Sequence, residues 1–177
     1  MKSRLFSIGT KARSSRPHML NATSKTEIEV LGDKDDSVAF GWVAQAVLYT
    51  QFQGGFTAPI SQVYAARLSA LVAQSQSLCF FCDSSELKSY DVLARSSFAR
   101  VILSNRRKFS SIVMLAWADG VSPATQALVT TIGEPIQVLT NRNTFEVQLL
   151  RKAPLALRKV DSADWGNIAR PTPASRK

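Results

Sequence analysis

The sequence predicts one small α/β domain, built on a mostly parallel sheet of four or five strands with about four helices. Two observations support this prediction. Short apolar segments alternate along the chain with longer segments whose apolar residues recur at helical spacing. The apolar segments at 78–82 and 112–117 are continuous, as expected for strands buried on both faces of a parallel sheet. A repeated strand–helix order implies right-handed parallel crossovers.

The domain begins with short strands. Residues 27–31 alternate polar and apolar side chains, which is typical of a half-exposed strand, and residues 32–36 have the composition of a turn. The segments 38–43 and 46–52 are rich in β-branched and aromatic residues. At least the second of these two segments is predicted to be a strand.

A helix is expected after Gly54-Gly55. Thr57 is a suitable N-cap, and Pro59 falls in the first helical turn, where a missing N–H costs little. No Lys-Ser or Lys-Thr follows the two glycines, so they predict a capping turn and not a phosphate-binding loop. The apolar stripe of this helix consists of Ile60, Tyr64, Leu68, Leu71 and Val72.

The second half of the domain repeats the alternation. A helix is expected at 90–106, a buried strand at 111–118, a helix at 122–132 and a short strand at 135–139. A last helix follows, capped at residue 141 or 143, and after it the pattern stops at Pro154. The inward residues predicted for the second and the last helix are Ala94, Phe98, Val101, Ile102, Phe145, Leu149 and Leu150.

The charges divide the chain into three parts. The formal net charge is +9, yet residues 1–26 hold six bases and no acid, and residues 151–177 hold seven bases and two acids. The remaining residues, 27–150, hold nine bases and eleven acids. We therefore expect a nearly neutral domain at 27–150 between two flexible basic tails. The tails are suited to weak contact with nucleic acid or an anionic membrane, or only keep the protein in solution.

No familiar catalytic or metal-binding pattern is present in the domain. The only histidine, His18, lies in the N-terminal tail, which leaves no imidazole for a catalytic triad or a zinc site. Cys79 and Cys82 have CxxC spacing. Because residues three apart in a strand point to opposite faces, we interpret them as buried structural thiols. No cofactor is expected.

Carboxylates at strand ends leave one enzymatic alternative open. Asp83 and Asp119 follow predicted neighbouring strands, and Asp91 precedes a helix. Open α/β sheets bind ligands at such strand ends, so these carboxylates could hold Mg²⁺ for phosphoryl transfer. Aspartate is also an ordinary cap and turn residue, and no base or nucleophile accompanies the three side chains.

The order of elements resembles the STAS domain, the fold of sulfate transporters and anti-sigma-factor antagonists such as SpoIIAA. In that family a buried strand ends in an acidic residue, and a second motif of the type Asp-Ser-Ser-Gly-Leu begins the next helix. Here the strand at 78–82 ends at Asp83, and Asp91 stands eight residues further on. The resemblance covers residues 27–150. It implies a non-catalytic regulatory module that binds another protein in signal transduction. A bacterial cytoplasmic protein is the default expectation, because the sequence shows no pattern of a secretion signal or a membrane span.

One residue departs from the family pattern. Antagonists controlled by phosphorylation have Ser or Thr directly after the second Asp, where this chain has Val92. Valine has no hydroxyl, so the usual phosphate switch is absent at this position. Ser84, Ser85 and Ser89 in the adjoining loop do have hydroxyls, although turn or cap contacts are the ordinary use of Ser84 and Ser85.

The resemblance places the partner surface in the loop at 83–90 and at the start of the following helix. Helix N-termini offer unpaired N–H groups, and the apolar side chains here would add contact area. Two alternatives stay open, the metal-assisted enzyme and an adaptor whose basic tails contact nucleic acid or membrane. No segment reaches the ~20 apolar residues of a transmembrane helix. The predicted partner-binding residues are Asp83, Ser84, Ser85, Leu87, Tyr90, Asp91, Val92 and Arg95.

Overall fold

A mostly parallel sheet forms the centre of the fold. The computed structural model describes residues 28–116, 126, 129–131, 133, 136–161 and 163, and within them six strands lie side by side in chain order. β1, β2 and β3 are antiparallel, whereas β3, β4, β5 and β6 are parallel. The predicted fold class is confirmed, with one strand more than expected. The strands are β1 (Glu29–Gly32), β2 (Ser37–Ala44), β3 (Val47–Phe56), β4 (Leu78–Tyr90), β5 (Phe109–Leu115) and β6 (Ile136–Leu139).

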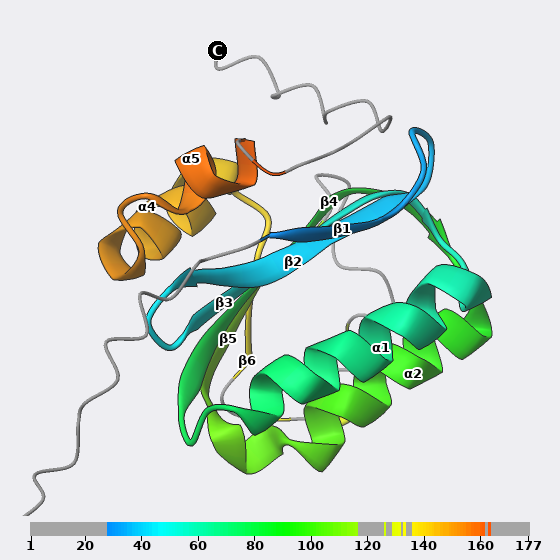
Figure 1. Ribbon diagram of the computed structural model, residues 1–177. Helices are drawn as coiled ribbons and strands as arrows, with labels where there is room; N and C mark the ends of the chain where they lie inside the picture. Colours follow the sequence, from blue (N-terminus) through cyan, green and yellow to red (C-terminus); the bar gives the residue numbers. More distant parts are fainter. Residues whose placement is uncertain are drawn as a thin grey trace, which may run out of the picture.

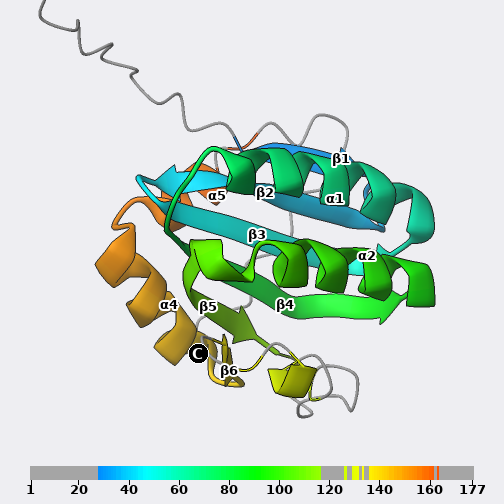
Figure 2. The same cartoon turned by 90° about the horizontal axis from the view of Figure 1, so that it is seen from below.

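Helices cover both faces of the sheet. α1 (Ala58–Ala73) and α2 (Val92–Ser104) lie side by side on one face (Figures 1 and 2). α4 (Arg142–Lys152) and α5 (Ala156–Asp161) pack on the opposite face, and a single 3-10 turn, η1 (Arg106–Lys108), precedes β5. The sheet therefore separates two hydrophobic cores.

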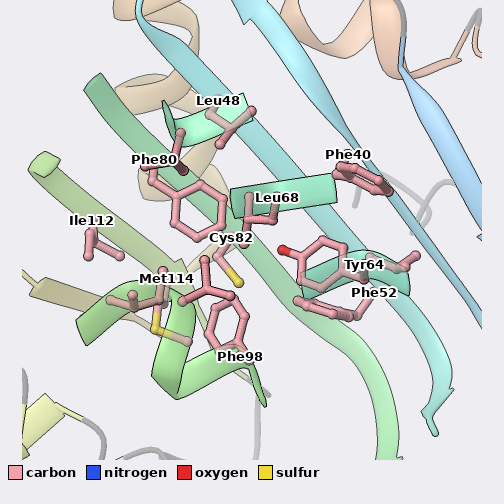
Figure 3. Close-up of a cluster of buried hydrophobic side chains, with 14 of the residues drawn as sticks. Phe40, Leu48, Phe52, Tyr64, Leu68, Phe80, Cys82, Phe98, Ile112 and Met114 are labelled. Carbon is pink, nitrogen blue, oxygen red and sulfur yellow. The ribbon is translucent and has the colours of Figure 1, made fainter. Parts of the chain in front are cut away.

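The first core lies between the sheet and the helices α1 and α2 (Figure 3). The ring of Tyr64 lies 5.7 Å from that of Phe52 and stacks on Phe98 at 6.3 Å. Its hydroxyl bonds to Thr50 Oγ1 at 2.9 Å, so the one polar group of this ring is satisfied inside the core. The buried residues of the two helices follow the predicted stripes: Tyr64, Leu68 and Val72 in α1, and Ala94, Phe98, Val101 and Ile102 in α2.

The second core shows that the domain extends beyond residue 150. Phe145 and Leu149 point inward from α4 as predicted, but Leu150 is partly exposed. The chain continues through α5, where Lys159 Nζ donates to the carbonyl oxygen of Val43 at 2.6 Å. Residues 151–161 and residue 163 thus belong to the domain and not to a loose basic tail. Their inward side chains are small, which is why the apolar pattern is weak: Ala153, Ala156, Val160 and Ala163.

Two strands run further than the sequence indicates. β3 includes Gly54-Gly55, which we predicted as a turn, and β4 includes the whole segment 83–90, which we predicted as a loop. The two extensions pair with each other in parallel, with register shifts after Gln51 and Gly54. The extended part of β4 is mostly polar, so hydrophobic alternation gives no sign of it.

The predicted strand at 135–139 and the cap of the last helix are also present. Asn141 Oδ1 accepts a hydrogen bond from Thr144 N at 3.0 Å and caps α4. Residues 126 and 129–131 are helical, while the rest of the helix predicted at 122–132 lies outside the described residues, as does Asp119. In the described part of the chain, no helix is long and apolar enough to cross a membrane.

The two cysteines point to opposite faces of β4, as strand geometry predicts. Cys82 belongs to the first core, and Cys79 packs against the second. Both are free thiols. Burial, aided by the neighbouring Asp83 carboxylate, raises the pKa of the Cys82 thiol. A thiol held in its neutral form is a poor nucleophile and a poor metal ligand, so Cys82 is a structural residue.

We expect the stability of the protein to fall above about pH 10. Burial, with a smaller contribution from Asp83, raises the pKa of Tyr49, and burial also raises the pKa of Tyr64. Above pH 10 the unfolded chain releases these phenolic protons while the folded chain keeps them. Each tyrosine then lowers the free energy of unfolding by up to about 1.4 kcal/mol per pH unit, and below pH 10 this loss is absent.

Urea unfolding at a series of pH values between about 8 and 11 measures this slope. The variant Tyr49→Phe should show a shallower fall than the wild type, because one of the two buried phenols is gone. An equal free energy of unfolding throughout this range would contradict the prediction.

Candidate functional site

The predicted site residue Asp83 is buried and fully engaged inside the protein. Its side chain is 1% exposed, on the second-core face of β4. Oδ1 accepts hydrogen bonds from Ser85 N at 3.0 Å and Ser85 Oγ at 2.6 Å, and Oδ2 accepts one from Arg142 Nη1 at 3.1 Å. Arg142 Nη2 also donates to Ser85 Oγ, and Glu146 lies 3.8 Å from Nη1. Asp83 therefore holds the start of α4 to the sheet, and its burial keeps the carboxylate from contact with a partner.

The two serines next to Asp83 have internal contacts as well. Ser84 Oγ donates to the carbonyl oxygen of Leu115 in β5 at 2.7 Å, and Ser85 Oγ donates to Asp83 Oδ1. Leu87 is half-buried against the first core. These residues of the predicted site thus have contacts within the domain that hold the extended part of β4.

Asp91 joins the two helices of the first layer. It is the N-cap residue of α2, but its side chain makes no capping bond to α2. Instead Oδ2 accepts a hydrogen bond from Ala58 N, the first residue of α1, at 2.7 Å, and Asp91 N donates to Phe56 O at 3.1 Å. Asp91 therefore holds the N-termini of α1 and α2 side by side. The amides of the first turn of α2 receive no side-chain cap, and Asp91 at the N-cap is the acidic residue next to them.

An exposed apolar patch remains at the start of α2. Val92 is 69% exposed, Leu93 65% and Tyr90 40%, and the exposed Arg95 follows one turn later. We call these four residues the α2 patch. Leu93 was missing from the predicted site, although the predicted inward stripe through Ala94 and Phe98 leaves its neighbour Leu93 on the outside of the helix.

Six of the eight predicted residues separate into two groups, while Ser84 bonds to β5 and Leu87 packs against the first core. Tyr90, Val92 and Arg95 are exposed members of the α2 patch, and the exposed Asp91 bonds to the start of α1. Asp83 and Ser85 bond to α4, on the other face of the sheet. Of the three carboxylates considered for a magnesium site, two already bind groups of the protein. Asp83 is paired with Arg142, and Asp91 accepts a hydrogen bond from the amide of Ala58. Within the described residues, no group of three or more His, Cys, Asp or Glu side chains could hold a metal ion.

Comparison with known proteins finds a likeness of fold. The chain is similar to a protein with a SpoIIAA-like fold. This is an uncharacterized protein of the DUF3478 family from Shewanella loihica PV-4, 14% identical, with 69% of this chain and 91% of that chain covered and a TM-score of 0.48. No family model matches the sequence, and no curated protein matches it.

Proposed function

We propose that this protein is a non-catalytic regulatory module that binds a partner protein through the α2 patch. The exposure of Val92 and Leu93, adjacent at the first turn of one helix, is the observation that supports this proposal most strongly. Apolar side chains that gather on a surface mark sites of association, because burying them against a partner removes that area from water. Tyr90 adds an amphipathic ring of the kind enriched at protein interfaces.

The surroundings of the α2 patch indicate the chemistry of the partner. Arg95 within the patch and Lys88, two residues before Tyr90, are exposed cations. The carboxylate of the exposed Asp91 accepts a hydrogen bond from Ala58 N, at the N-termini of α1 and α2, so the cations are what favours negative charge on the partner. A partner with an apolar side chain at its centre and carboxylates around it would complement this surface.

A phosphate switch at the usual position of the STAS-like fold has no place in this proposal. Val92 offers no hydroxyl, and Ser96, one turn further along, donates its hydroxyl to the carbonyl oxygen of Val92 at 2.8 Å. Ser84 and Ser85 are engaged inside the domain. Affinity for the partner therefore depends on the patch itself and not on phosphorylation of residue 92.

The variant Leu93→Ser should weaken partner binding at least tenfold, which corresponds to about 1.4 kcal/mol. The partner would first be identified by affinity purification of the intact protein from its native cells, and its dissociation constant measured by titration calorimetry. Leu103→Ser is the matched control, since Leu103 is 41% exposed near the other end of α2. It should leave the affinity within about twofold.

Asp91 is unsuitable for this experiment because its carboxylate fixes the start of α1. Any loss of binding on its substitution would mix a structural effect with a lost contact. Equal weakening by Leu93→Ser and Leu103→Ser, or none by Leu93→Ser, would contradict a partner surface at the start of α2.

A further inference from the structure

A second exposed apolar surface lies on the opposite side of the sheet from the α2 patch. Leu155 is 54% exposed, Val147 49% and Leu150 36%. Val147 and Leu150 are three residues apart, so they share the outer side of α4, away from the buried Phe145 and Leu149. Leu155 directly precedes α5. These apolar residues and the neighbouring exposed cations form what we call the α4–α5 face: Val147, Leu150, Arg151, Lys152, Leu155 and Arg158.

The cations of this face have no ion-pair partner among the residues that the structure describes. Arg151, Lys152 and Arg158 are exposed, and none of them forms an ion pair with a described residue. The two helices contain only two acids, Glu146 and Asp161, and Glu146 lies beside Arg142. The surface therefore combines exposed aliphatic side chains with unneutralised positive charge.

Both basic flanks join the domain on the same side. The described chain starts at Ile28 and reaches Ala163, and both residues are buried in the second core beneath α4 and α5. Residues 1–27, attached to Ile28, hold six bases and one acid, and residues 164–177 hold three bases and one acid.

We propose that the α4–α5 face binds the surface of an anionic phospholipid membrane. Lys and Arg near such a surface interact with its negative potential, and aliphatic side chains enter the boundary between head groups and acyl chains. Single-stranded nucleic acid would instead favour exposed aromatic rings for stacking, and Tyr90, on the other side of the sheet, is the only exposed large aromatic residue in the described chain. The aliphatic character of the face therefore favours lipid.

This surface leaves the proposed partner site free. α4 and α5 lie on one side of the sheet, and the α2 patch belongs to the helix layer on the other side (Figure 1). A molecule resting on a membrane through α4 and α5 would present α2 towards the aqueous phase. The inference does not depend on the proposed function, since partner binding and membrane binding use different residues.

Vesicle cosedimentation of the full-length protein tests the proposal. Vesicles of phosphatidylcholine with about one third phosphatidylserine would be compared with phosphatidylcholine alone, at low and at physiological salt. The triple variant Arg151→Glu/Lys152→Glu/Arg158→Glu should lower the partition coefficient at least tenfold. The charge-matched control is Arg95→Glu/Arg100→Glu/Arg107→Glu, which reverses three exposed cations elsewhere and should lower it less than threefold.

A second pair of variants tests the apolar contribution without changing charge. Leu155→Ser should reduce binding to anionic vesicles by about threefold to tenfold, whereas Leu93→Ser in the α2 patch should not change it. Equal losses in the two triple variants would overturn the proposal in favour of unspecific charge attraction. The absence of binding to anionic vesicles would also overturn the proposal. If vesicles are not bound but a short DNA duplex is, and the first triple variant abolishes that binding, the face binds nucleic acid instead.

Discussion

Replacing Arg142 by Ala should lower the free energy of unfolding by about 3–5 kcal/mol. Asp83 would remain buried with its charge while losing the guanidinium that lies 3.1 Å from Oδ2. Ser85 alone cannot compensate, because its two donors reach only Oδ1. The loss should also loosen α4, since Arg142 is the first residue of that helix and bonds directly to β4.

Urea unfolding followed by circular dichroism measures this effect, with two further variants as controls. Glu146→Gln removes the outer partner of Arg142, a longer contact of 3.8 Å, and should cost less than about 1 kcal/mol. Asp83→Asn combined with Arg142→Ala should be more stable than Arg142→Ala alone, because no buried charge is then left unpaired. An Arg142→Ala variant within about 1 kcal/mol of the wild type would contradict the assignment.

This ion pair marks the limit of what the sequence could predict about the site. Asp83 was recognised as a residue at the end of an apolar segment, but Arg142 stands 59 positions away. Nothing in the local pattern joins an arginine at a helix start to one particular carboxylate. Only the sheet order, with β4, β5 and β6 adjacent, brings α4 over the end of β4.

Periodicity predicted the interior far better than the surface. The inward residues of α2 were all correct, because a stripe at helical spacing follows directly from burial against a flat sheet. The extension of β4 to Tyr90 was missed, because polar residues in a strand show no apolar alternation and resemble a loop. α5 was missed for a related reason, since its buried residues are only Ala156 and Val160, which bury little area and carry a weak hydrophobic signal.

Gly54 was predicted to form a turn before α1, but it lies within strand β3. Its substitution is the second change for which we expect a large loss of stability. The backbone of Gly54 has a φ of +69° within β3, where an L side chain is strained. A Cβ added there would lie 1.8 Å from the carbonyl oxygen of Asp35 in the turn between β1 and β2. Asp36 of that turn accepts a hydrogen bond from Gly55 N at 2.6 Å, so the turn lies directly on the glycine pair.

We expect Gly54→Ala to lower the free energy of unfolding by at least about 3 kcal/mol, since backbone strain and the displacement of a packed turn add together. Gly55→Ala is the matched control. Its φ is not in the left-handed region, and the atoms nearest to its Cβ would be those of the Asp36 carboxylate at 3.1–3.2 Å, a side chain that can move. It should cost about 1 kcal/mol, mainly through the bond to Asp36. Equal midpoints of urea unfolding for the two variants would contradict the prediction. They would show that the turn between β1 and β2 can move without loss of stability, and that residue 54 need not be glycine to adopt its positive φ.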